Sequence, residues 1–245
     1  MLNKIFVENC LDTMRRMPDG FVDLVVTSPP YNMNLRIRNG QYCSRQIVKE
    51  ISTKYDNFAD NLPIDDFYDL HAKVLTELLR VSDLVFYNIQ IVTGSKRAFF
   101  KLIGEFSDYL KEIIVWDKGH GQPAMQSQVL NRRSELILVF DKNNAISRKF
   151  EAASFARGTL DDIWLITREF KKNNFRHGAT FPEKLVEIIL TNFSASDAIV
   201  YDPFLGTGTT ALVAKRLNRN FVGSELSQGY VDVAVGRLKS EGFDV

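Results

Sequence analysis

The chain has 245 residues, of which 45% are hydrophobic and 25% charged, and its formal net charge is +1. This length accommodates one α/β core with a modest insertion. The near-neutral charge excludes a global attraction to nucleic acids or membranes, so any basic surface must be local. The two cysteines, Cys10 and Cys43, have no metal-ligand spacing and predict neither a metal site nor a disulfide framework. Without a signal peptide or an apolar run of membrane-spanning length, we expect a soluble intracellular protein.

The N-terminal part of the chain alternates short apolar runs with a helical pattern. A strand is predicted over residues 4–8, a helix over 10–17 and a buried strand over 22–26. The turn at 18–20 contains Pro and Gly, which separates the helix from the second strand.

The segment 32–60 keeps no clear hydrophobic period, and we predict a long mobile loop there. Its part from 32 to 53 carries four basic residues with an aromatic among them: Arg36, Arg38, Tyr42, Arg45 and Lys49. Basic side chains interleaved with an aromatic ring can contact phosphates and stack on bases. A solvated charged loop has the same composition, so both interpretations stay open at this point.

Helices and strands then alternate again. A helix is predicted over 63–80, a strand over 83–88, a helix over 96–106 and a strand over 112–116. This alternation predicts right-handed βαβ units and a parallel sheet.

The alternation stops in the region of about 119–176, which we predict to be an insertion. Residues 119–123 are expected to form a loop, 135–140 a strand, and 141–160 irregular structure. The candidate contacts to a polyanion in this region are Arg132, Arg133, Arg148, Lys149, Lys171 and Lys172. Nearby acids offset much of this charge, so a solvated loop region is the alternative interpretation.

The last part of the chain returns to an α/β pattern. Helices are predicted over 181–193, 207–217 and 230–239, and strands over 198–202 and 221–225. Together with the first part, this predicts one α/β domain over residues 1–245.

The first motif is Ser28-Pro29-Pro30-Tyr31, which follows the strand at 22–26. Two prolines fix φ twice and remove two backbone donors, so the chain leaves the strand as a stiff extended segment. Ser28 contributes a hydroxyl and Tyr31 a flat aromatic face. Rigid acceptors beside an aromatic ring suit a planar ring that bears an amino group. A strand that ends in a proline turn is the plainer alternative.

The second motif runs over residues 202–210, between a strand and a helix. Gly206 and Gly208 allow a tight turn and a close approach of the backbone, and the following helix N-terminus favours an anionic group. Glu225, at the end of the next strand, is suited to accept hydrogen bonds from a ribose diol. The motif therefore predicts an adenosine-containing cofactor. If the two preceding strands are neighbours, that cofactor faces Ser28.

These two motifs together resemble those of the DNA amino-methyltransferases, which modify adenine N6 or cytosine N4. The catalytic motif precedes the cofactor motif, as in the beta group of that family, and the resemblance covers nearly the whole chain. It implies a Rossmann-like α/β fold with a mostly parallel sheet and helices on both faces. It also implies S-adenosylmethionine as cofactor, double-stranded DNA as substrate, a cytoplasmic location, and the insertion at about 119–176 as the target-recognition region.

The resemblance assigns roles to individual residues. The implied catalytic residues are Ser28, Pro29, Pro30 and Tyr31. The implied cofactor contacts are Asn9, Cys10, His177, Phe181, Asp202, Pro203, Phe204, Gly206, Gly208, Thr209 and Glu225. The implied DNA contacts are Arg36, Arg38, Arg45, Lys49, Arg132, Arg133, Arg148, Lys149, Lys171 and Lys172. Ser28 resembles the cytosine-N4 enzymes slightly more than the adenine-N6 enzymes, many of which carry Asp there.

Several functions remain open from the sequence. An inactive methyltransferase-like protein that only binds DNA would be favoured by a damaged motif, and neither motif is damaged. A methyltransferase acting on RNA or on a protein amide would also present planar nitrogen to this site. A dinucleotide oxidoreductase would leave the Ser-Pro-Pro-Tyr motif unexplained. The recognition sequence, a partner restriction endonuclease, and the choice between monomer and homodimer are not determined by these residues.

Overall fold

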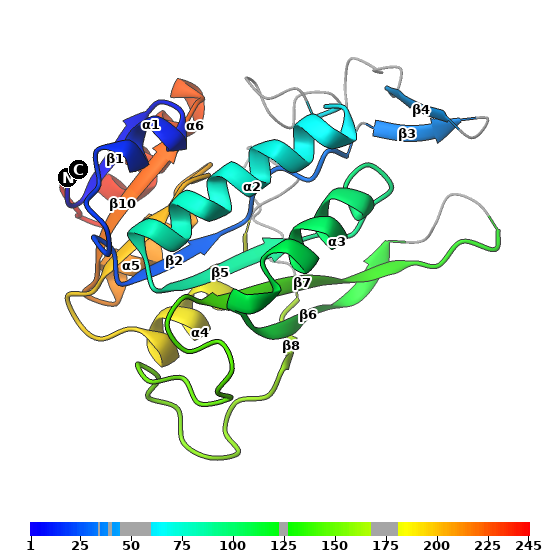
Figure 1. Ribbon diagram of the computed structural model, residues 1–245. Coiled ribbons are helices and arrows are strands. Elements are labelled where there is room, and N and C mark those ends of the chain that lie inside the picture. The colour runs from blue at the N-terminus through cyan, green and yellow to red at the C-terminus, as the bar shows by residue number, and fades with distance from the viewer. Residues whose placement is uncertain (34, 39–40, 45–59, 123–126, 168–180) are drawn as a thin grey trace.

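A computed structural model describes the chain except residues 34, 39–40, 45–59, 123–126 and 168–180 (Figure 1). The strands of its main sheet are β1 (Lys4–Val7), β2 (Leu24–Thr27), β5 (Leu84–Ile89), β6 (Leu110–Gln122), β7 (Arg132–Asp141), β8 (Ile163–Leu165), β9 (Ile199–Asp202) and β10 (Asn220–Glu225). The helices are α1 (Cys10–Arg15), α2 (Ile64–Val81), α3 (Lys96–Glu105), α4 (Glu183–Phe193), α5 (Thr209–Arg216) and α6 (Gln228–Ser240), with a short 3₁₀ helix at Ser107–Tyr109.

The sheet has eight strands in the order β1-β10-β9-β2-β5-β7-β6-β8. Neighbouring strands are parallel except at β7, which runs antiparallel to both β5 and β6. The predicted α/β fold with a mostly parallel sheet is therefore confirmed. The crossover connections through α2, α5 and other helices explain the parallel pairs, because a parallel strand cannot follow its neighbour through a tight hairpin.

Two hydrophobic layers cover the sheet, one on each face. Successive side chains of a strand point to opposite faces, so Val25 packs in the layer formed with α1, α2 and α3, while Leu24 and Val26 pack in the layer formed with α4, α5 and α6. All three side chains are fully buried. The apolar run at 22–26 is explained by this two-sided burial, and the prediction of helices on both faces is confirmed.

The strands β2 and β9 are parallel neighbours, with Leu24 opposite Val200 and Val25 opposite Tyr201. From β9 the chain proceeds to β10, whereas from β2 it proceeds to β5 on the other side. The β2–β9 pair is therefore the topological switch point, where open α/β sheets bind ligands beyond the carboxyl ends of the strands. The strands that precede the two sequence motifs are therefore neighbours, as the sequence interpretation required.

The pattern of segment 32–60 had predicted a long loop, but part of the segment forms strands. It contains an antiparallel pair of strands, β3 (Leu35–Arg38) and β4 (Gln41–Ser44). The alternation of Leu35 and Ile37 with basic residues was the available signal, but four residues are too short a window to separate a strand from a loop. Residues 45–59, with Arg45 and Lys49, lie outside the described residues.

The secondary structure predicted for the region 119–176 also differs from the structure in its described part. The predicted loop at 119–123 is wrong up to Gln122, because β6 continues through it and pairs with β7. A register shift between Asp117 and Gln122, with Gly119 at φ 76°, breaks the alternation and hides the strand in the sequence. The strand β8 was not predicted; it pairs with β6, so the described strands of this region extend the main sheet.

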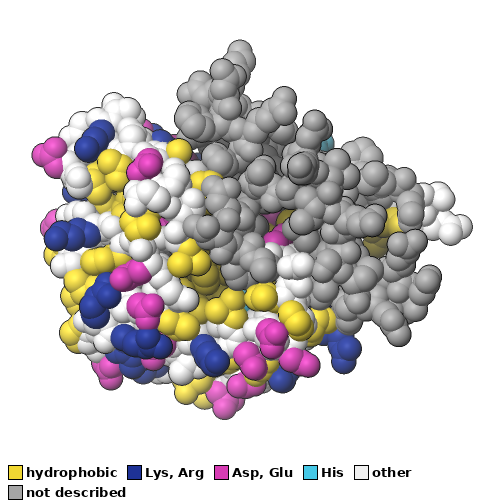
Figure 2. Space-filling model, turned by 90° about the horizontal axis from the view of Figure 1, so that it is seen from above, with side chains coloured by type: hydrophobic (Ala, Val, Ile, Leu, Met, Phe, Trp, Pro, Cys, Tyr) yellow, Lys and Arg dark blue, Asp and Glu magenta, His cyan; other side chains and the backbone are white. Residues whose placement is uncertain are grey.

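On the face seen from above in Figure 2, the described Lys and Arg side chains are interspersed with Asp and Glu, and no sign predominates. This mixture agrees with the net charge of +1. Within the described residues, no helix has both the length and the apolar character needed to cross a membrane.

Candidate active site

The first motif turns back on itself just after β2. The Ser28 hydroxyl oxygen lies 2.6 Å from the Tyr31 hydroxyl oxygen. Tyr31 is only 6% exposed, and both prolines between them are buried. The stiff segment predicted from the two prolines therefore positions a serine and a tyrosine at the carboxyl end of β2, with their hydroxyl groups in contact.

Three further polar side chains surround this pair, and the sequence patterns had pointed to none of them. Glu135, at the start of β7, accepts a hydrogen bond from the Tyr31 hydroxyl at 3.0 Å. Asn88, at the end of β5, donates through Nδ2 to the Tyr31 oxygen at 2.5 Å and to Glu135 Oε2 at 2.7 Å. Lys118 on β6 forms an ion pair with Glu135 Oε1 at 2.5 Å. The available signal in the sequence was Glu135, an acidic residue directly before the apolar run at 136–140. Because successive side chains of a strand point to opposite faces, its position relative to that run indicates an inward side chain.

The carboxylate of Asp202 connects the second motif to the first. Its Oδ1 accepts hydrogen bonds from Thr27 Oγ1 at 2.8 Å and from the Phe204 backbone N–H at 3.0 Å. Its Oδ2 accepts from Thr210 Oγ1 at 2.7 Å. Burial raises the pKa of Asp202 to about 6, although these hydrogen bonds act in the opposite direction. Asp202 thus fixes the end of β9 to the end of β2.

This raised pKa makes a testable contribution to stability. A buried carboxyl whose folded pKa exceeds its unfolded pKa disfavours folding once it ionises, so its penalty appears as the pH rises from 4 to 7. In Asp202→Asn the penalty is absent. We therefore expect the free energy of unfolding of the wild type, relative to that of Asp202→Asn, to fall by about 2 kcal/mol between pH 4 and pH 7.

Urea unfolding of both proteins at the two pH values measures this difference. The same substitution at exposed Asp232, on α6, provides the baseline. A relative stability that stays constant with pH would contradict the assignment of a raised pKa to Asp202.

The glycine loop that follows β9 is held by Glu225. The Gly206 backbone N–H donates to Glu225 Oε2, and the Ser227 backbone N–H donates to Glu225 Oε1, both at 2.9 Å. Gly206 and Gly208 have φ values of 54° and 81°, in the left-handed region that glycine adopts without steric cost. These two backbone donors fix the orientation of the Glu225 carboxylate beside the glycine loop. A fixed carboxylate at this position is compatible with the predicted contact to a ribose diol.

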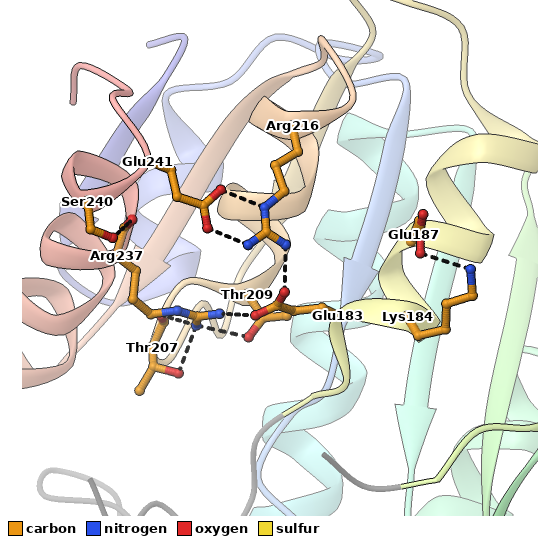
Figure 3. Close-up of polar contacts among 9 residues, drawn as sticks. All are labelled: Glu183, Lys184, Glu187, Thr207, Thr209, Arg216, Arg237, Ser240 and Glu241. Atoms are coloured by element: carbon orange, nitrogen blue, oxygen red, sulfur yellow. Dashed lines mark hydrogen bonds and ion pairs between the residues drawn. The ribbon is translucent and has the colours of Figure 1, made fainter. Parts of the chain in front are cut away.

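A network of ion pairs supports the glycine loop from α6 and α4 (Figure 3). Arg237 donates to the Thr207 backbone oxygen at 2.7 Å and to Thr209 Oγ1 at 3.1 Å. The same guanidinium pairs with Glu183 at 2.8 Å, and Glu183 also pairs with Arg216 at 2.6 Å. This network ties the loop to the start of α4, two residues after Phe181.

A cavity of about 60 Å³ lies between the two motifs. Its wall contains Ser28 from the first motif, Asp202, Phe204 and the glycine loop through Thr210 from the second, and Phe181. A space of this size holds a small group and not a whole nucleoside, and residues of both motifs line it. The acceptors and the aromatic rings on its wall fit the cofactor that the resemblance implies.

The remaining predicted cofactor residues lie at the same edge or outside the described residues. Asn9 and Cys10 follow β1, whose last residue, Val7, pairs with Glu225. Asn9 caps α1 by accepting a hydrogen bond from the Leu11 N–H at 2.9 Å. Burial raises the pKa of Cys10 to about 12, which keeps its thiol protonated. Predicted cofactor residue His177 lies outside the described residues.

Two of the predicted DNA contacts lie at the edge of the sheet formed by the carboxyl ends of β2, β5 and β9, here called the catalytic edge because the candidate catalytic loop follows β2 there. Arg132 and Arg133 are exposed at the start of β7, on the hairpin that projects past the carboxyl end of β5 (Figure 1). Arg132 donates to the Ile91 backbone oxygen at 2.6 Å, and Arg133 forms an ion pair with Asp117.

Two others lie at the opposite edge. Arg148 and Lys149 follow the end of β7, where Asp141 pairs with Leu84 at the amino end of β5. Both are exposed, and Lys149 forms an ion pair with Glu151. The antiparallel direction of β7 thus separates these residues from the catalytic edge, and the structure does not bring them to the site. The side chains of Arg36 and Arg38, and residues Lys171 and Lys172, lie outside the described part of the chain.

The family model described as DNA methylase matches residues 22–236, which include both motifs. The chain belongs to the DNA methylase family. Among its relatives, the Type II methyltransferase M.BglII of Bacillus subtilis is 28% identical over 274 residues, which cover 98% of this chain and 70% of that protein. The methylase is therefore an S-adenosylmethionine-dependent DNA methyltransferase, as the two motifs had implied, with double-stranded DNA as its substrate.

Solved structures show the same fold. The cytosine-N4-specific PvuII DNA methyltransferase matches this methylase with a TM-score of 0.75 at 16% identity, over 98% of this chain and 88% of that one. A putative DNA modification methylase from Thermus thermophilus, complexed with S-adenosyl-L-methionine, matches with a TM-score of 0.67 at 22% identity, over 98% of this chain and 96% of that one. No group of three or more potential metal ligands occurs among the described residues of the methylase.

Proposed function

We propose that this methylase modifies the exocyclic amine of a base flipped out of duplex DNA, with Ser28, Pro29, Pro30 and Tyr31 as its catalytic loop. Cytosine N4 is the favoured acceptor because of Ser28, and adenine N6 is the second. The observation that carries the proposal is the shared cavity, whose wall contains Ser28 together with Asp202 and the glycine loop. This arrangement supports transfer from a cofactor on one motif to an amine on the other.

The chemistry requires acceptors more than it requires a strong base. The lone pair of an exocyclic amine is delocalised into the ring, which makes the nitrogen a poor nucleophile. Ser28 Oγ and the Pro29 carbonyl would accept its two N–H groups and so localise the lone pair. Positioned acceptors and proximity then supply most of the rate. The amine is inaccessible within the duplex, so the base must leave the stack, and the ring of Tyr31 would stack on it.

The cofactor side of the site has matching residues. S-adenosylmethionine, when bound, supplies the electrophilic methyl group. Glu225, oriented by two backbone N–H groups, would accept hydrogen bonds from the ribose. Gly206 and Gly208 would allow the backbone to approach the cofactor closely, and the rings of Phe181 and Phe204 would contact it from the cavity wall. Further cofactor contacts are proposed for Asn9, Cys10, His177, Asp202, Pro203 and Thr209.

Incubation of DNA with the methylase and S-adenosylmethionine carrying an isotopically labelled methyl group tests this proposal. Mass spectrometry of the nucleosides should find the label on N4-methylcytosine, or on N6-methyladenine if the second acceptor is correct. Long-read sequencing of the same DNA gives the sequence context. Label confined to RNA or protein, or cofactor binding without any methylation, would contradict the proposal.

The two edges of the sheet give a matched test of DNA contact. The logarithm of the DNA-binding constant falls linearly with the logarithm of the salt concentration. We expect the double variant Arg132→Ala, Arg133→Ala to make this slope less steep by about 0.9 for each lost phosphate contact. Arg148→Ala with Lys149→Ala removes the same charge from the opposite edge and should leave the slope nearly unchanged. Binding of a duplex measured by fluorescence anisotropy at several salt concentrations decides between the edges. Equal slopes for the two double variants would contradict the proposed orientation.

We further propose a role in restriction–modification, because M.BglII is a Type II methyltransferase. The methylase would then protect a sequence that a partner restriction endonuclease cleaves. DNA from cells that express it should resist cleavage at the methylated sequence, and the DNA of control cells should be cut. Analytical ultracentrifugation determines whether it acts as a monomer or a homodimer.

A further inference from the structure

We propose that Glu135 is a positioning residue that orders a chain of hydrogen bonds from Ser28 through Tyr31, and that this chain carries away the proton released by the amine. The proposal rests on the proposed function of Ser28 as the acceptor for the amine. It adds a buried carboxylate to a motif that has none of its own, since Ser28 stands where many adenine enzymes carry Asp.

The direction of the chain follows from what each group can donate. An ionised carboxylate only accepts hydrogen bonds, so the Tyr31 hydroxyl donates its single proton to Glu135 Oε2, at 3.0 Å. With that proton committed, the contact between Ser28 and Tyr31 at 2.6 Å requires the Ser28 hydroxyl to be the donor. Ser28 Oγ is then left with its lone pairs as acceptors; Asn88 Nδ2 approaches one of them at 3.3 Å, and the other faces further partners. Glu135 therefore fixes Ser28 as an acceptor, the role that binding an amine N–H requires.

The surroundings of Glu135 hold its carboxylate in place. The side chains of Glu135 and Lys118 are 6% and 2% exposed, and their ion pair at 2.5 Å balances the charge. Asn88 donates through Nδ2 to Glu135 Oε2 at 2.7 Å. These groups come from the adjacent strands β5, β7 and β6. Hydrogen bonds with a charged partner are strong in a buried site, so the orientation of the chain is firmly set.

The same contacts form a path for a proton. Once the amine nitrogen carries the methyl group, it must lose one proton. Ser28 Oγ accepts that proton as its own passes to the Tyr31 oxygen, and the Tyr31 proton passes to Glu135 Oε2. In total, one N–H bond of the amine is broken and one O–H bond is formed at Glu135. Ser28 and Tyr31 each gain one proton and lose one, so both end as neutral hydroxyl groups. The neutral Glu135 then returns the proton to water.

A double-mutant cycle tests this proposal. Tyr31→Phe removes only the hydroxyl and keeps the aromatic ring, while Glu135→Gln removes only the charge. We expect each single variant to lower the single-turnover rate of methyl transfer by about 100-fold, with the KM for DNA and the Kd for S-adenosylmethionine little changed. Because Glu135 acts through the Tyr31 hydroxyl, Glu135→Gln in the Tyr31→Phe background should cause no further loss. Glu135→Asp should recover part of the rate.

Controls separate this proposal from a structural role and from the proposed function itself. Glu151→Gln breaks an exposed Lys–Glu pair at the opposite edge of the sheet and should not change the rate. If the effects of Tyr31→Phe and Glu135→Gln multiply, or if Glu135→Gln lowers thermal stability but not the rate, the chain is refuted. Should Glu135→Gln fail to fold, a full rate in Tyr31→Phe would by itself refute it. An unchanged rate in Ser28→Ala would instead contradict the proposed function.

Discussion

Replacing Ser28 with Ala should lower the rate of methyl transfer by about 100-fold or more, as the loss of a positioned hydrogen-bond partner does in other enzymes. Ser28 Oγ lies at the junction of the two motifs, in the wall of the cavity that the glycine loop also lines. Its loss removes an acceptor for the amine N–H and the first member of the chain that leads to Glu135. The ring of Tyr31 and the loop at Gly206 remain, so binding of DNA and cofactor should change little.

Single-turnover kinetics with saturating cofactor measures this effect, because product release does not limit the rate. Calorimetry of S-adenosylmethionine binding shows whether the cofactor site is intact. Ser147→Ala, in the loop at the opposite edge of the sheet, is the matched control and should retain the wild-type rate. If Ser28→Ala changes the Kd of the cofactor and not the rate, Ser28 belongs to the cofactor site alone.

Gly208→Ala should both destabilise the protein and weaken cofactor binding. A Cβ at position 208 would approach the Ala234 Cβ to 2.6 Å and the Ala234 Cα to 3.1 Å. Ala234 is part of α6 and cannot turn its methyl group away, so the loop and α6 must separate. The left-handed backbone at φ 81° adds its own cost. Together these effects predict a loss of about 2–5 kcal/mol in the free energy of unfolding.

Two other glycines give matched controls for the same added methyl group. A Cβ at Gly206 would meet only the Phe204 backbone oxygen, at 4.0 Å, so Gly206→Ala should lose only the backbone term of about 1–2 kcal/mol. Gly236 is exposed within α6 with nothing near its Cβ, and Gly236→Ala should stabilise the protein by about 0.5–1 kcal/mol. Urea unfolding and calorimetry of cofactor binding measure the series. Equal losses at 206 and 208 would show that close approach to α6 is not the cause.

Most elements of the fold could be predicted because their signals are local. The strands β2 and β9 lie within the short, mostly apolar runs at 22–26 and 198–202 or extend one residue past them, and Pro and Gly mark the turns that follow. The failures were also local in origin. The β3–β4 pair has too few residues for a period to be detected, and β6 continues past a glycine and a register shift that interrupt its alternation. Of the residues predicted to be irregular, 141–160, all but the first are irregular, and residue 141 ends β7.

The sequence by itself determined both motifs, their order, and the side chains that flank each strand end. Proline and glycine restrict the backbone wherever they occur, so the geometry of these loops is encoded within a few residues. The cofactor class and the candidate role of Ser28 therefore follow from local patterns of residues, and the family follows from the resemblance of these patterns to those of known methyltransferases.

Only the tertiary structure decided which distant residues support that site. Tyr31 and Glu135 are 104 positions apart, and Thr27 and Asp202 are 175 positions apart. Their contacts depend on the order and register of whole strands, which no local pattern encodes. The antiparallel direction of β7 brings Glu135 and Arg132 to the catalytic edge and takes Arg148 to the opposite one. The physical reason is strand pairing: one reversal of direction determines which of these residues can act at the site.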